Sequence, residues 1–374
     1  MSGRTDRAFM EMAYGLAAKA AGLTSPNPAV GAVVVRRGVI TGWGFHARAG
    51  SPHAEIVALN KAGRRAKGAT LYVTLEPCVH WGKTPPCADA VLAAEPARVV
   101  ISARDPNPVV HNKGIARLRE AGLDVSVGIL EERNLRLNES AIKFITRKRP
   151  FVTLKAAVSL DGKLAARSRD SRWISSSAAR EYTRLLREDH DAVLIGIGTL
   201  TADDPLLTVR HPFRKGKPVV RIILDSKLRF PPSARILSTL AEGPVLVIAG
   251  EGAPRRKADL LRRKGVEVVV LPAPQGRPDL DAVLGELARR DLAALLVEGG
   301  RDIHTAFLEQ GLADKMLLVV APLLLGGRDT PGLFEGRGAD RIADGIPFAQ
   351  SRVFSIGKDL VVEGYLPCSQ ASSP

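Results

Sequence analysis

The sequence has few cysteines, few aromatic residues and no long apolar run. Its 374 residues include three cysteines, too few for a disulfide scaffold, and aromatic residues make up only 5%. No segment reaches the roughly 20 consecutive apolar residues that a membrane helix needs. The N-terminus, MSGRTDRAFMEMAYG, carries charges where a signal peptide has an apolar core. These absences predict a cytoplasmic protein that does not associate with membranes.

Acidic residues are also scarce relative to basic ones, and the formal net charge is +15. Residues 1–150 contain 22 Lys and Arg against 12 Asp and Glu, and residues 151–374 contain 32 against 27. A basic surface attracts phosphates, whether on nucleic acid or on a small substrate. Because no basic segment is interleaved with aromatic residues, we favour a general richness in arginine over a nucleic-acid-binding surface.

The chain is long enough for two domains, which we expect at residues 1–148 and 150–366, divided at Pro150. Apolar periodicity and turn residues predict the elements of the first domain. They are, in order, a helix over 4–22, a hairpin over 31–44 with its turn at Arg37-Gly38, a helix from near His53, a strand over 69–77, a helix over 87–95, a strand over 97–105, a helix ending at Gly122, a strand over 123–129 and a helix over 130–148. This alternation predicts a sheet with helices on both faces.

The second region also alternates between strands and helices and is predicted to be a distinct α/β domain. Its expected strands cover 151–159, 192–199, 218–225, 244–249, 266–271, 293–298 and 315–321, with helices over 279–290 and 302–310 and a final hairpin over 352–365. We find no internal repeat.

Two of the three cysteines, Cys78 and Cys87, lie in one proline-rich segment, EPCVHWGKTPPCAD. His53 opens a predicted helix directly after Pro52. One imidazole and two thiolates form a three-ligand zinc set with an open fourth position, which distinguishes catalytic from structural zinc. A helix start at Cys87 favours its thiolate. The sequence therefore predicts Zn²⁺ at His53, Cys78 and Cys87.

Glu55 is the predicted catalytic residue. Zinc lowers the pKa of its bound water to about 7, and a nearby carboxylate can pass the released proton to a leaving amine. Positions i and i+2 do not share a face of a regular helix, so His53 and Glu55 can face one centre only in the helix's first turn. A His-x-Glu followed by Pro-Cys and a second Cys is typical of zinc nucleobase deaminases, although those have two residues between the cysteines and this chain has eight.

Other polar residues extend this hypothesis, and alternatives stay open. Asn27, between two prolines, is a candidate reader of a pyrimidine edge, although an ordinary turn explains it equally well. For His46 and His80 a surface position is the simpler interpretation, and His80 is also the main rival zinc ligand. The cysteines alone are compatible with buried apolar positions. The competing functions are a nucleic-acid-editing zinc deaminase and a zinc-stabilised, non-enzymatic scaffold.

With these residues the chain resembles the bifunctional deaminase–reductase family of riboflavin biosynthesis. The resemblance spans nearly the whole chain and rests on SPNPAVGAVVV, GWGFHARAGSPHAE, TLEPCVHWGKTPPCADA, DPNP, LKAAVSLDGK, DSRWISS, DAVLIGIGT, DDPLLTVR and VEGG. It implies a cytidine-deaminase-like α/β/α N-terminal domain that removes the ring amine of a diaminopyrimidinone carrying a phosphoribosylamino group. It also implies a dihydrofolate-reductase-like α/β C-terminal domain that reduces the product's ribosyl group to ribityl with NADPH. A homodimer or homotetramer is the implied assembly.

One residue departs from the family pattern. After DPNP the family usually carries a glycine where this chain has Asn112. Asparagine is the next-best residue for a left-handed backbone angle, so we expect the turn to be kept.

The second site must hold a nicotinamide cofactor and a sugar phosphate. No GxGxxG follows a strand, so the Rossmann fingerprint is absent. In LLVEGGRDIHTAF, a predicted strand ends at Glu298 and a helix begins near Asp302, which places free N–H groups at the cofactor phosphates. Arg210, in DDPLLTVR, is a candidate phosphate grip, and Arg187 is placed to act from the other side.

The resemblance also implies residues for each ligand of this second site. The sugar-phosphate substrate is expected to contact Ser171, Arg187, Leu207, Arg210 and Glu298. NADPH is expected to contact Ala157, Trp173, Thr199, Asp203, Ser226, Gly300, Arg301, Asp302, Ile303, His304, Thr305 and Ala306. Lys227 is our first candidate for the preference for NADPH, and Lys155 is either a substrate contact or a buried stem with a solvated head.

Overall fold

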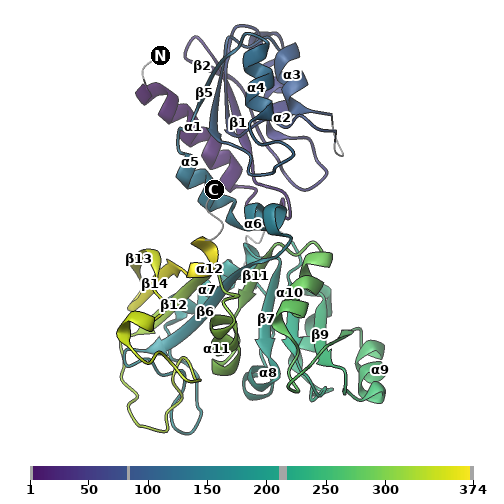
Figure 1. Cartoon of the computed structure of the whole chain (residues 1–374), viewed down its shortest axis with the longest axis vertical. Helices are drawn as coiled ribbons and strands as arrows, with labels where there is room; N and C mark the ends of the chain where they lie inside the picture. Colours follow the sequence, from purple (N-terminus) through teal and green to yellow (C-terminus); the bar gives the residue numbers. More distant parts are fainter. Residues whose placement is uncertain (1–2, 82–84, 210–216, 371–374) are drawn as a thin grey trace. The chain divides into compact units, whose positions relative to one another are not determined.

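The computed structural model describes residues 3–81, 85–209 and 217–370. These residues form two compact units, the first ending at Lys148 and the second beginning at Arg149 (Figure 1). Within the described residues, no strand of one unit joins the sheet of the other. None of the helices in these ranges is long and apolar enough to cross a bilayer.

The first unit contains a five-stranded sheet of order β2-β1-β3-β4-β5. Strand β1 is antiparallel to β2 and to β3, whereas β3, β4 and β5 are parallel. The elements are α1 (Gly3–Ala18), β1 (Gly31–Arg36), β2 (Val39–Phe45), α2 (Ala54–Ala62), η1 (Gly63–Ala66), β3 (Thr70–Leu75), α3 (Cys87–Ala93), β4 (Arg98–Ala103), α4 (Lys113–Glu120), β5 (Asp124–Val127), α5 (Glu131–Leu137) and α6 (Glu139–Arg147).

Helices cover both faces of this sheet, as the alternation of strands and helices predicted (Figure 1). In the central strand β3, Leu71 and Val73 join the core that α2, α3 and α4 cover, whereas Tyr72 joins the core beneath α1. Successive side chains of a strand point to opposite faces, so one buried strand contributes to two cores. Each fully buried apolar side chain of this size contributes about 1.5–3 kcal/mol. The sheet is therefore a stable platform for the loops at its edge.

The predicted single helix over 130–148 was wrong, because it breaks at Asn138 into α5 and α6. The backbone of Asn138 leaves the helical region, with φ −108° and ψ 12°. Its side-chain amide donates to the carbonyl of Ala29 (3.1 Å) and accepts from the Ala29 N–H (2.7 Å). This paired contact to the segment before β1 favours the break over a continuous helix. The first helix also ends earlier than expected, at Ala18 rather than at residue 22.

The second unit contains a nine-stranded sheet of order β10-β9-β8-β7-β11-β6-β12-β14-β13. The strands from β10 to β12 in this order run parallel to one another. Strand β14 is antiparallel to β12, and β13 is antiparallel to β14. The elements are β6 (Phe151–Ser159), α7 (Ser177–Glu188), β7 (Ala192–Gly196), α8 (Ile197–Asp203), β8 (Val220–Leu224), η2 (Arg235–Glu242), β9 (Val245–Gly250), α9 (Arg255–Arg263), β10 (Glu267–Leu271), α10 (Leu280–Arg289), β11 (Ala294–Val297), α11 (Arg301–Glu309), β12 (Lys315–Ala321), η3 (Ile342–Asp344), β13 (Ala349–Ile356), β14 (Asp359–Tyr365) and α12 (Pro367–Gln370).

One predicted strand of this unit, 192–199, was wrong in its last part. Strand β7 ends at Gly196, and the helix α8 begins at once and carries Thr199 and Asp203. A side chain at Gly196 would place its Cβ 2.7 Å from the terminal Cδ1 of Ile303, so the glycine lets the strand end pack closely against α11. The turn directs Thr199 and Asp203 to the carboxyl edge of the parallel strands, where ligands of α/β sheets commonly bind.

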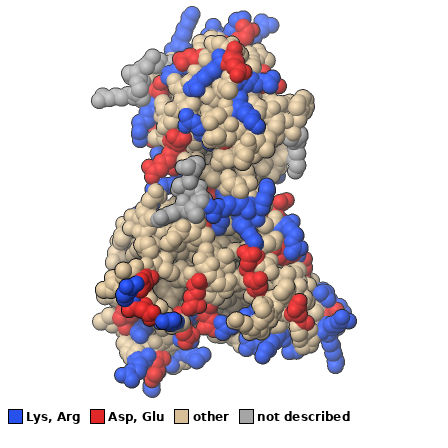
Figure 2. All heavy atoms as spheres, in the orientation of Figure 1, with Lys and Arg blue, Asp and Glu red and all other residues tan. Residues whose placement is uncertain are grey.

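The surface charge of the described residues is mixed. On the face drawn in Figure 2, basic and acidic side chains lie interspersed over both units and do not form one continuous basic band. Nucleic-acid-binding proteins usually gather their basic residues on one face or stripe. The observed pattern on this face agrees with the interpretation of the high net charge as general arginine richness.

Candidate active sites

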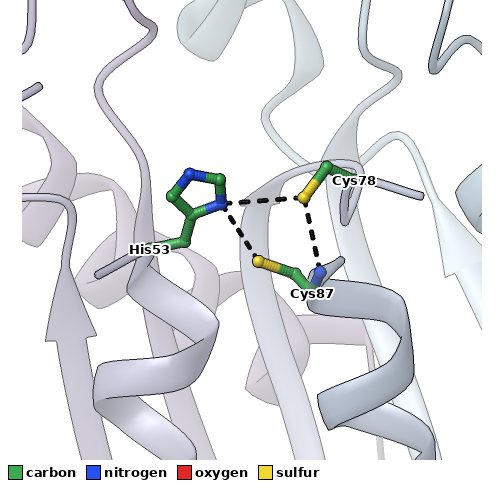
Figure 3. Close-up of side chains that lie close together, drawn as sticks. All are labelled: His53, Cys78 and Cys87. Carbon is green, nitrogen blue, oxygen red and sulfur yellow. Dashed lines mark hydrogen bonds between the residues drawn. The ribbon is translucent and has the colours of Figure 1, made fainter. Parts of the chain in front are cut away.

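His53, Cys78 and Cys87 lie together in the first unit (Figure 3). Nδ1 of His53 lies 3.0 Å from Sγ of Cys87 and 3.7 Å from Sγ of Cys78. The three ligand atoms all lie within 4.8 Å of one another. The backbone N–H of Cys87 donates to the Cys78 sulfur at 3.3 Å. The structure therefore brings together the three residues that the sequence predicted as metal ligands.

Each of the three residues stands at the end of a regular element. His53 is the N-cap of α2, and Cys87 is the first residue of α3. Cys78 follows β3, and its carbonyl accepts the N–H of Ala88 at 3.1 Å, which ties this turn to the start of α3. Helix N-termini favour negative charge, so the two helix starts favour thiolates at the centre.

The chemistry of this donor set fits zinc. Hydrogen bonding from the Cys87 thiol is the largest cause that lowers the pKa of the Cys78 thiol, to about 4. The same bond raises the pKa of Cys87, so the two sulfurs share a proton. Protons and metal ions compete for such sulfurs. Imidazole and thiolate ligands suit Zn²⁺, and a three-residue set leaves the fourth position that a catalytic zinc requires.

Glu55 lies beside this cluster, in the first turn of α2, which is where the sequence required it to be. Its side chain is buried, and it lies close enough to Cys87 for each group to shift the pKa of the other. Burial raises the pKa of Glu55 to about 7, against the opposing effects of a backbone amide and of His53. A carboxyl group with such a pKa can both accept and donate a proton near neutral pH.

The neighbouring polar residues differ in how they match the predictions. The expected surface position of His46 was wrong: its side chain is buried, and its ring lies edge-on to His53 at a centroid distance of 5.3 Å. Nε2 of His46 has no hydrogen-bond partner among the described residues. His80 is exposed, as expected, and is not part of the triad. Asn27 is exposed in the turn before β1.

Glu76 is a buried residue beside the site that sequence reasoning missed. Its Oε2 accepts the N–H groups of Asp105 and Asn112, and its Oε1 accepts that of Ile115, each at 3.1 Å. A carboxylate at the N-terminus of α4 stabilises that helix through its free N–H groups. Glu76 therefore ties the strand end before Cys78 to the segment 105–115. The sequence feature that could have identified Glu76 was its position directly before Pro77-Cys78.

The DPNP turn keeps its shape despite the departure from the family pattern. Asn112 adopts the left-handed conformation, with φ 61° and ψ −7°, as we expected for a residue that replaces glycine. Its side-chain oxygen accepts a hydrogen bond from Nε of Arg104 at 3.0 Å. Two residues later, Gly114 is required by space, because a Cβ there would lie 2.2 Å from the carbonyl oxygen of Pro77.

Two adjoining cavities lie at the carboxyl edge of the second sheet, with volumes of about 1070 Å³ and about 510 Å³. The larger cavity is lined by most of the predicted cofactor residues: Ala157, Thr199, Asp203, Ser226, Gly300, Arg301, Asp302, Ile303, His304 and Ala306. The smaller cavity is lined by the predicted substrate residues Ser171, Arg187, Leu207 and Glu298, and by Trp173. Lys155, Ala157, Ser171, Thr199, Asp203 and Glu298 line both.

One predicted residue lines neither cavity, and another lies outside the residues that the structure describes. Thr305 lines neither one, and its hydroxyl instead accepts the N–H of Glu335 at 2.9 Å. Arg210 lies outside the described residues.

The N-terminus of α11 opens into the larger cavity, with Gly300 as its N-cap. A Cβ at Gly299 would lie 2.9 Å from Cβ of Ile303, so the missing side chain lets the first helical turn pack against the strand end. Free backbone N–H groups and the helix dipole make such a terminus a binding site for phosphates.

Arg187 and Glu298 form a largely buried ion pair that lines the smaller cavity. Nε and Nη2 of Arg187 donate to the two carboxylate oxygens of Glu298 at 2.6 and 2.8 Å, and Nη1 donates to the carbonyl of Thr208 at 3.1 Å. Burial opposes ionisation of Glu298, but Arg187 and Lys155 hold its pKa below the ordinary value. The guanidinium group of Arg187, which the sequence suggested as a phosphate ligand, is therefore already hydrogen-bonded to Glu298.

Removing one partner of this pair is expected to destabilise the second unit. An Arg187→Met protein leaves the Glu298 charge buried without its partner, which costs about 3 kcal/mol. Calorimetric or urea unfolding of the full chain measures the loss, and the double variant Arg187→Met/Glu298→Leu is expected to recover most of it. The control is Arg337→Met, which breaks the exposed pair with Asp340 and should cost less than about 1 kcal/mol. Equal losses in Arg187→Met and Arg337→Met would contradict this account.

Comparison with known proteins places two family models on the chain. Residues 3–103 match the cytidine and deoxycytidylate deaminase zinc-binding region, and residues 150–362 match the RibD C-terminal domain. The chain is 44% identical to the riboflavin biosynthesis protein RibD of Aquifex aeolicus, over 96% of this chain and 97% of the relative. It is 39% identical to RibD of Escherichia coli K12, over 95% and 98% of the two chains.

Solved structures agree with these matches. Acinetobacter baumannii RibD is 37% identical, with a TM-score of 0.84 over 97% of this chain and 99% of that one. The diaminohydroxyphosphoribosylaminopyrimidine deaminase/5-amino-6-(5-phosphoribosylamino)uracil reductase of Thermotoga maritima is 36% identical, with a TM-score of 0.82 over the same shares.

Proposed function

The chain belongs to the RibD family of riboflavin biosynthesis, and from this premise we propose which residues carry out each of its two reactions. It is a bifunctional enzyme with a cytidine-deaminase-like N-terminal half and a reductase as its C-terminal half, which confirms the predicted fold class and function. The nucleic-acid-editing alternative is not supported, because the family match includes the reductase half.

In the first reaction, water replaces the ring amine of 2,5-diamino-6-(5-phosphoribosylamino)pyrimidin-4-one, and ammonia leaves. His53, Cys78 and Cys87 would hold zinc, which when bound supplies the Lewis acidity that lets water ionise near neutral pH. Glu55 accepts a proton from the attacking water and donates one to the departing amine, so one carboxylate serves first as base and then as acid. The observation that carries this proposal is the convergence of the three ligand atoms within 4.8 Å, with the buried Glu55 two residues after the ligand His53.

In the second reaction, the ribosyl group of the deaminated product would be reduced to ribityl, with NADPH as the reductant. The residues of the larger cavity, which include the N-terminus of α11, would hold the cofactor, and those of the smaller cavity would hold the sugar phosphate. The smaller cavity is lined by six basic side chains against three acidic ones, which suits a phosphorylated ligand. Lys155 and Glu298 line both cavities, where the cofactor and the sugar would meet. The cofactor supplies the hydride, and these side chains orient the sugar.

A stepwise assay of the full-length protein tests this assignment. The diaminopyrimidine substrate should release ammonia with or without NADPH, whereas NADPH oxidation should require either that reaction or added deaminated product. Ammonia release without oxidation of any nicotinamide cofactor would contradict the reductase assignment, and the reverse result would contradict the deaminase assignment. The homodimer or homotetramer and the cytoplasmic location stay predictions.

A further inference from the structure

The break between α5 and α6 places a buried amide against the segment that precedes β1. Asn138 is 3% exposed, its side-chain oxygen accepts the N–H of Ala29 at 2.7 Å, and its nitrogen donates to the carbonyl of Ala29 at 3.1 Å. The N–H and the carbonyl of Ala29 belong to the two peptide planes that flank its Cα. Because buried backbone groups are costly to leave unpaired, these two bonds fix the position and the orientation of Ala29.

A second set of contacts holds the same segment from strand β3. The N–H of Gly31 donates to Oγ of Thr74 at 3.0 Å, and the side-chain amide of Asn134 donates to the carbonyl of Thr74. The carbonyl of Asn134 in turn accepts a hydrogen bond from the amide of Asn138 at 3.3 Å. Thr74, Asn134 and Asn138 are all buried. These residues form one buried network that joins α5, the α5–α6 junction and β3 to the start of β1.

Helix α5 is itself anchored to α1, on the face of the sheet opposite to α2 and α3 (Figure 1). Nη1 of Arg133 pairs with Oε2 of Glu11 at 2.5 Å, and the guanidinium group lies 4.1 Å from the centre of the Tyr14 ring. The match to the deaminase zinc-binding region ends at residue 103, so α5 and α6 lie beyond it. Their contacts nevertheless join them to the sheet of the first unit.

The segment that Asn138 holds leads to the metal centre. One residue after Ala29, the carbonyl of Val30 accepts the N–H of His46 at 2.9 Å, and the His46 ring lies edge-on to that of the ligand His53. Two residues before Ala29, Asn27 is exposed, and its side-chain amide has no hydrogen-bond partner among the residues that the structure describes. The segment 27–30 therefore carries an amide that is available to a ligand and is tied to the neighbour of a metal ligand.

We infer that Asn138 is a positioning residue for deamination: it holds Ala29 so that the segment 27–30 presents the amide of Asn27 to the pyrimidine. The inference rests on the deaminase function proposed above and on Asn27 as the reader of the ring edge. An amide that donates to and accepts from a ring edge works only at a fixed distance and orientation. A misplacement of about 1 Å can cost about 100-fold in rate, so the two bonds to Ala29 bear directly on catalysis.

Steady-state measurement of ammonia release by the full-length protein tests this role. Asn138→Ala should raise the KM for the diaminopyrimidine substrate about tenfold and change kcat less than about threefold, because a displaced Asn27 weakens binding of the ring in the ground state and in the transition state alike. Zinc content should equal that of the wild type, since the three ligands are untouched. NADPH oxidation with added deaminated product should also be unchanged, because Asn138 belongs to the first unit.

Three further variants separate positioning from a general loss of stability. Thr74→Val keeps the shape of the side chain but removes the acceptor of the Gly31 N–H, so it should raise the same KM. Val125→Ala removes apolar volume from the core beneath α4, and it should lower the melting temperature of the first unit without a change in KM. Asn60→Ala, which removes an exposed amide from α2, is the matched control and should leave KM unchanged.

A double-mutant cycle identifies the residue through which Asn138 acts. Asn27→Ala should raise KM by itself, and the addition of Asn138→Ala should raise it less than about twofold further, because the contact that Asn138 serves is already lost.

Several results would overturn the inference while the deaminase function stands. They are a wild-type KM in Asn138→Ala or in Asn27→Ala, effects of these two substitutions on KM that simply multiply, and a rise in KM in Val125→Ala as large as that in Asn138→Ala. If Asn138→Ala does not fold, Thr74→Val decides, and a wild-type KM in that variant overturns the inference. If wild-type protein releases no ammonia from the diaminopyrimidine, the proposed function itself fails, and the role of Asn138 fails with it.

Discussion

A Glu55→Gln protein is expected to lose ammonia release about 1000-fold or more while it keeps its zinc. Glutamine has the size of glutamate and can still form hydrogen bonds, but it cannot take up or deliver a proton. General acid–base catalysis by one positioned side chain typically contributes 100- to 10,000-fold, and Glu55 is proposed to act in two proton transfers. The ligands His53, Cys78 and Cys87 are untouched, so metal binding should not change.

Three measurements on one preparation check this prediction. Zinc content by elemental analysis should equal that of the wild type, ammonia release should be lost, and NADPH oxidation with added deaminated product should be unchanged. Glu120→Gln, at the exposed end of α4, is the matched control and should behave as wild type in all three. If Glu55→Gln releases ammonia at close to the wild-type rate, Glu55 is not the proton carrier.

The second large effect is expected from Cys87→Ser. A serine hydroxyl is not ionised at neutral pH, so the substitution removes one of three protein ligands from a buried position. Even changes beyond the ligands commonly cost 10- to 100-fold in metal affinity, so the loss here should be at least about 100-fold. We expect purified Cys87→Ser to contain almost no zinc and to release no ammonia, and its first unit to unfold at lower temperature than that of the wild type.

The second unit provides an internal reference for this variant. NADPH oxidation with deaminated product should be unchanged, because the metal ligands all belong to the first unit. Cys368→Ser makes the same substitution in α12, outside the triad, and should keep full zinc content. Treatment of wild-type protein with a strong chelator should reproduce the Cys87→Ser result. A Cys87→Ser protein that retains its zinc would show that the metal lies elsewhere.

The features that the sequence predicted well depend on local rules. Arg37 and Gly38 both adopt positive φ, 50° and 79°, which is what a two-residue hairpin turn between β1 and β2 requires. Cys87 opens α3 after Pro86, and His53 caps α2 after Pro52, since proline interrupts a helix in its interior and is tolerated at or before its start. Such helix starts are encoded within a few neighbouring residues, and they are enough to place two metal ligands and the carboxylate from the sequence alone.

The features that the sequence did not predict depend on distant partners. The break at Asn138 follows from hydrogen bonds to Ala29, 109 positions away. The ion pair between Arg187 and Glu298 joins residues 111 positions apart. The sequence motifs predicted that both residues line one site, but they did not show that the two charges neutralise each other. Glu76 was missed for the same reason, since its three backbone donors lie in a later segment. Periodicity and spacing report on one element at a time and carry no information about such pairs.

Among the described residues, every strand of each sheet comes from its own side of the Lys148–Arg149 bond. A chain divided at that bond would leave each catalyst with its complete sheet, so covalent fusion is not required to build either one. Because both domains belong to one chain, the cell produces them in equal numbers. The supply and consumption of the deaminated intermediate can then be balanced only through the turnover rates of the two centres, and not through separate levels of expression.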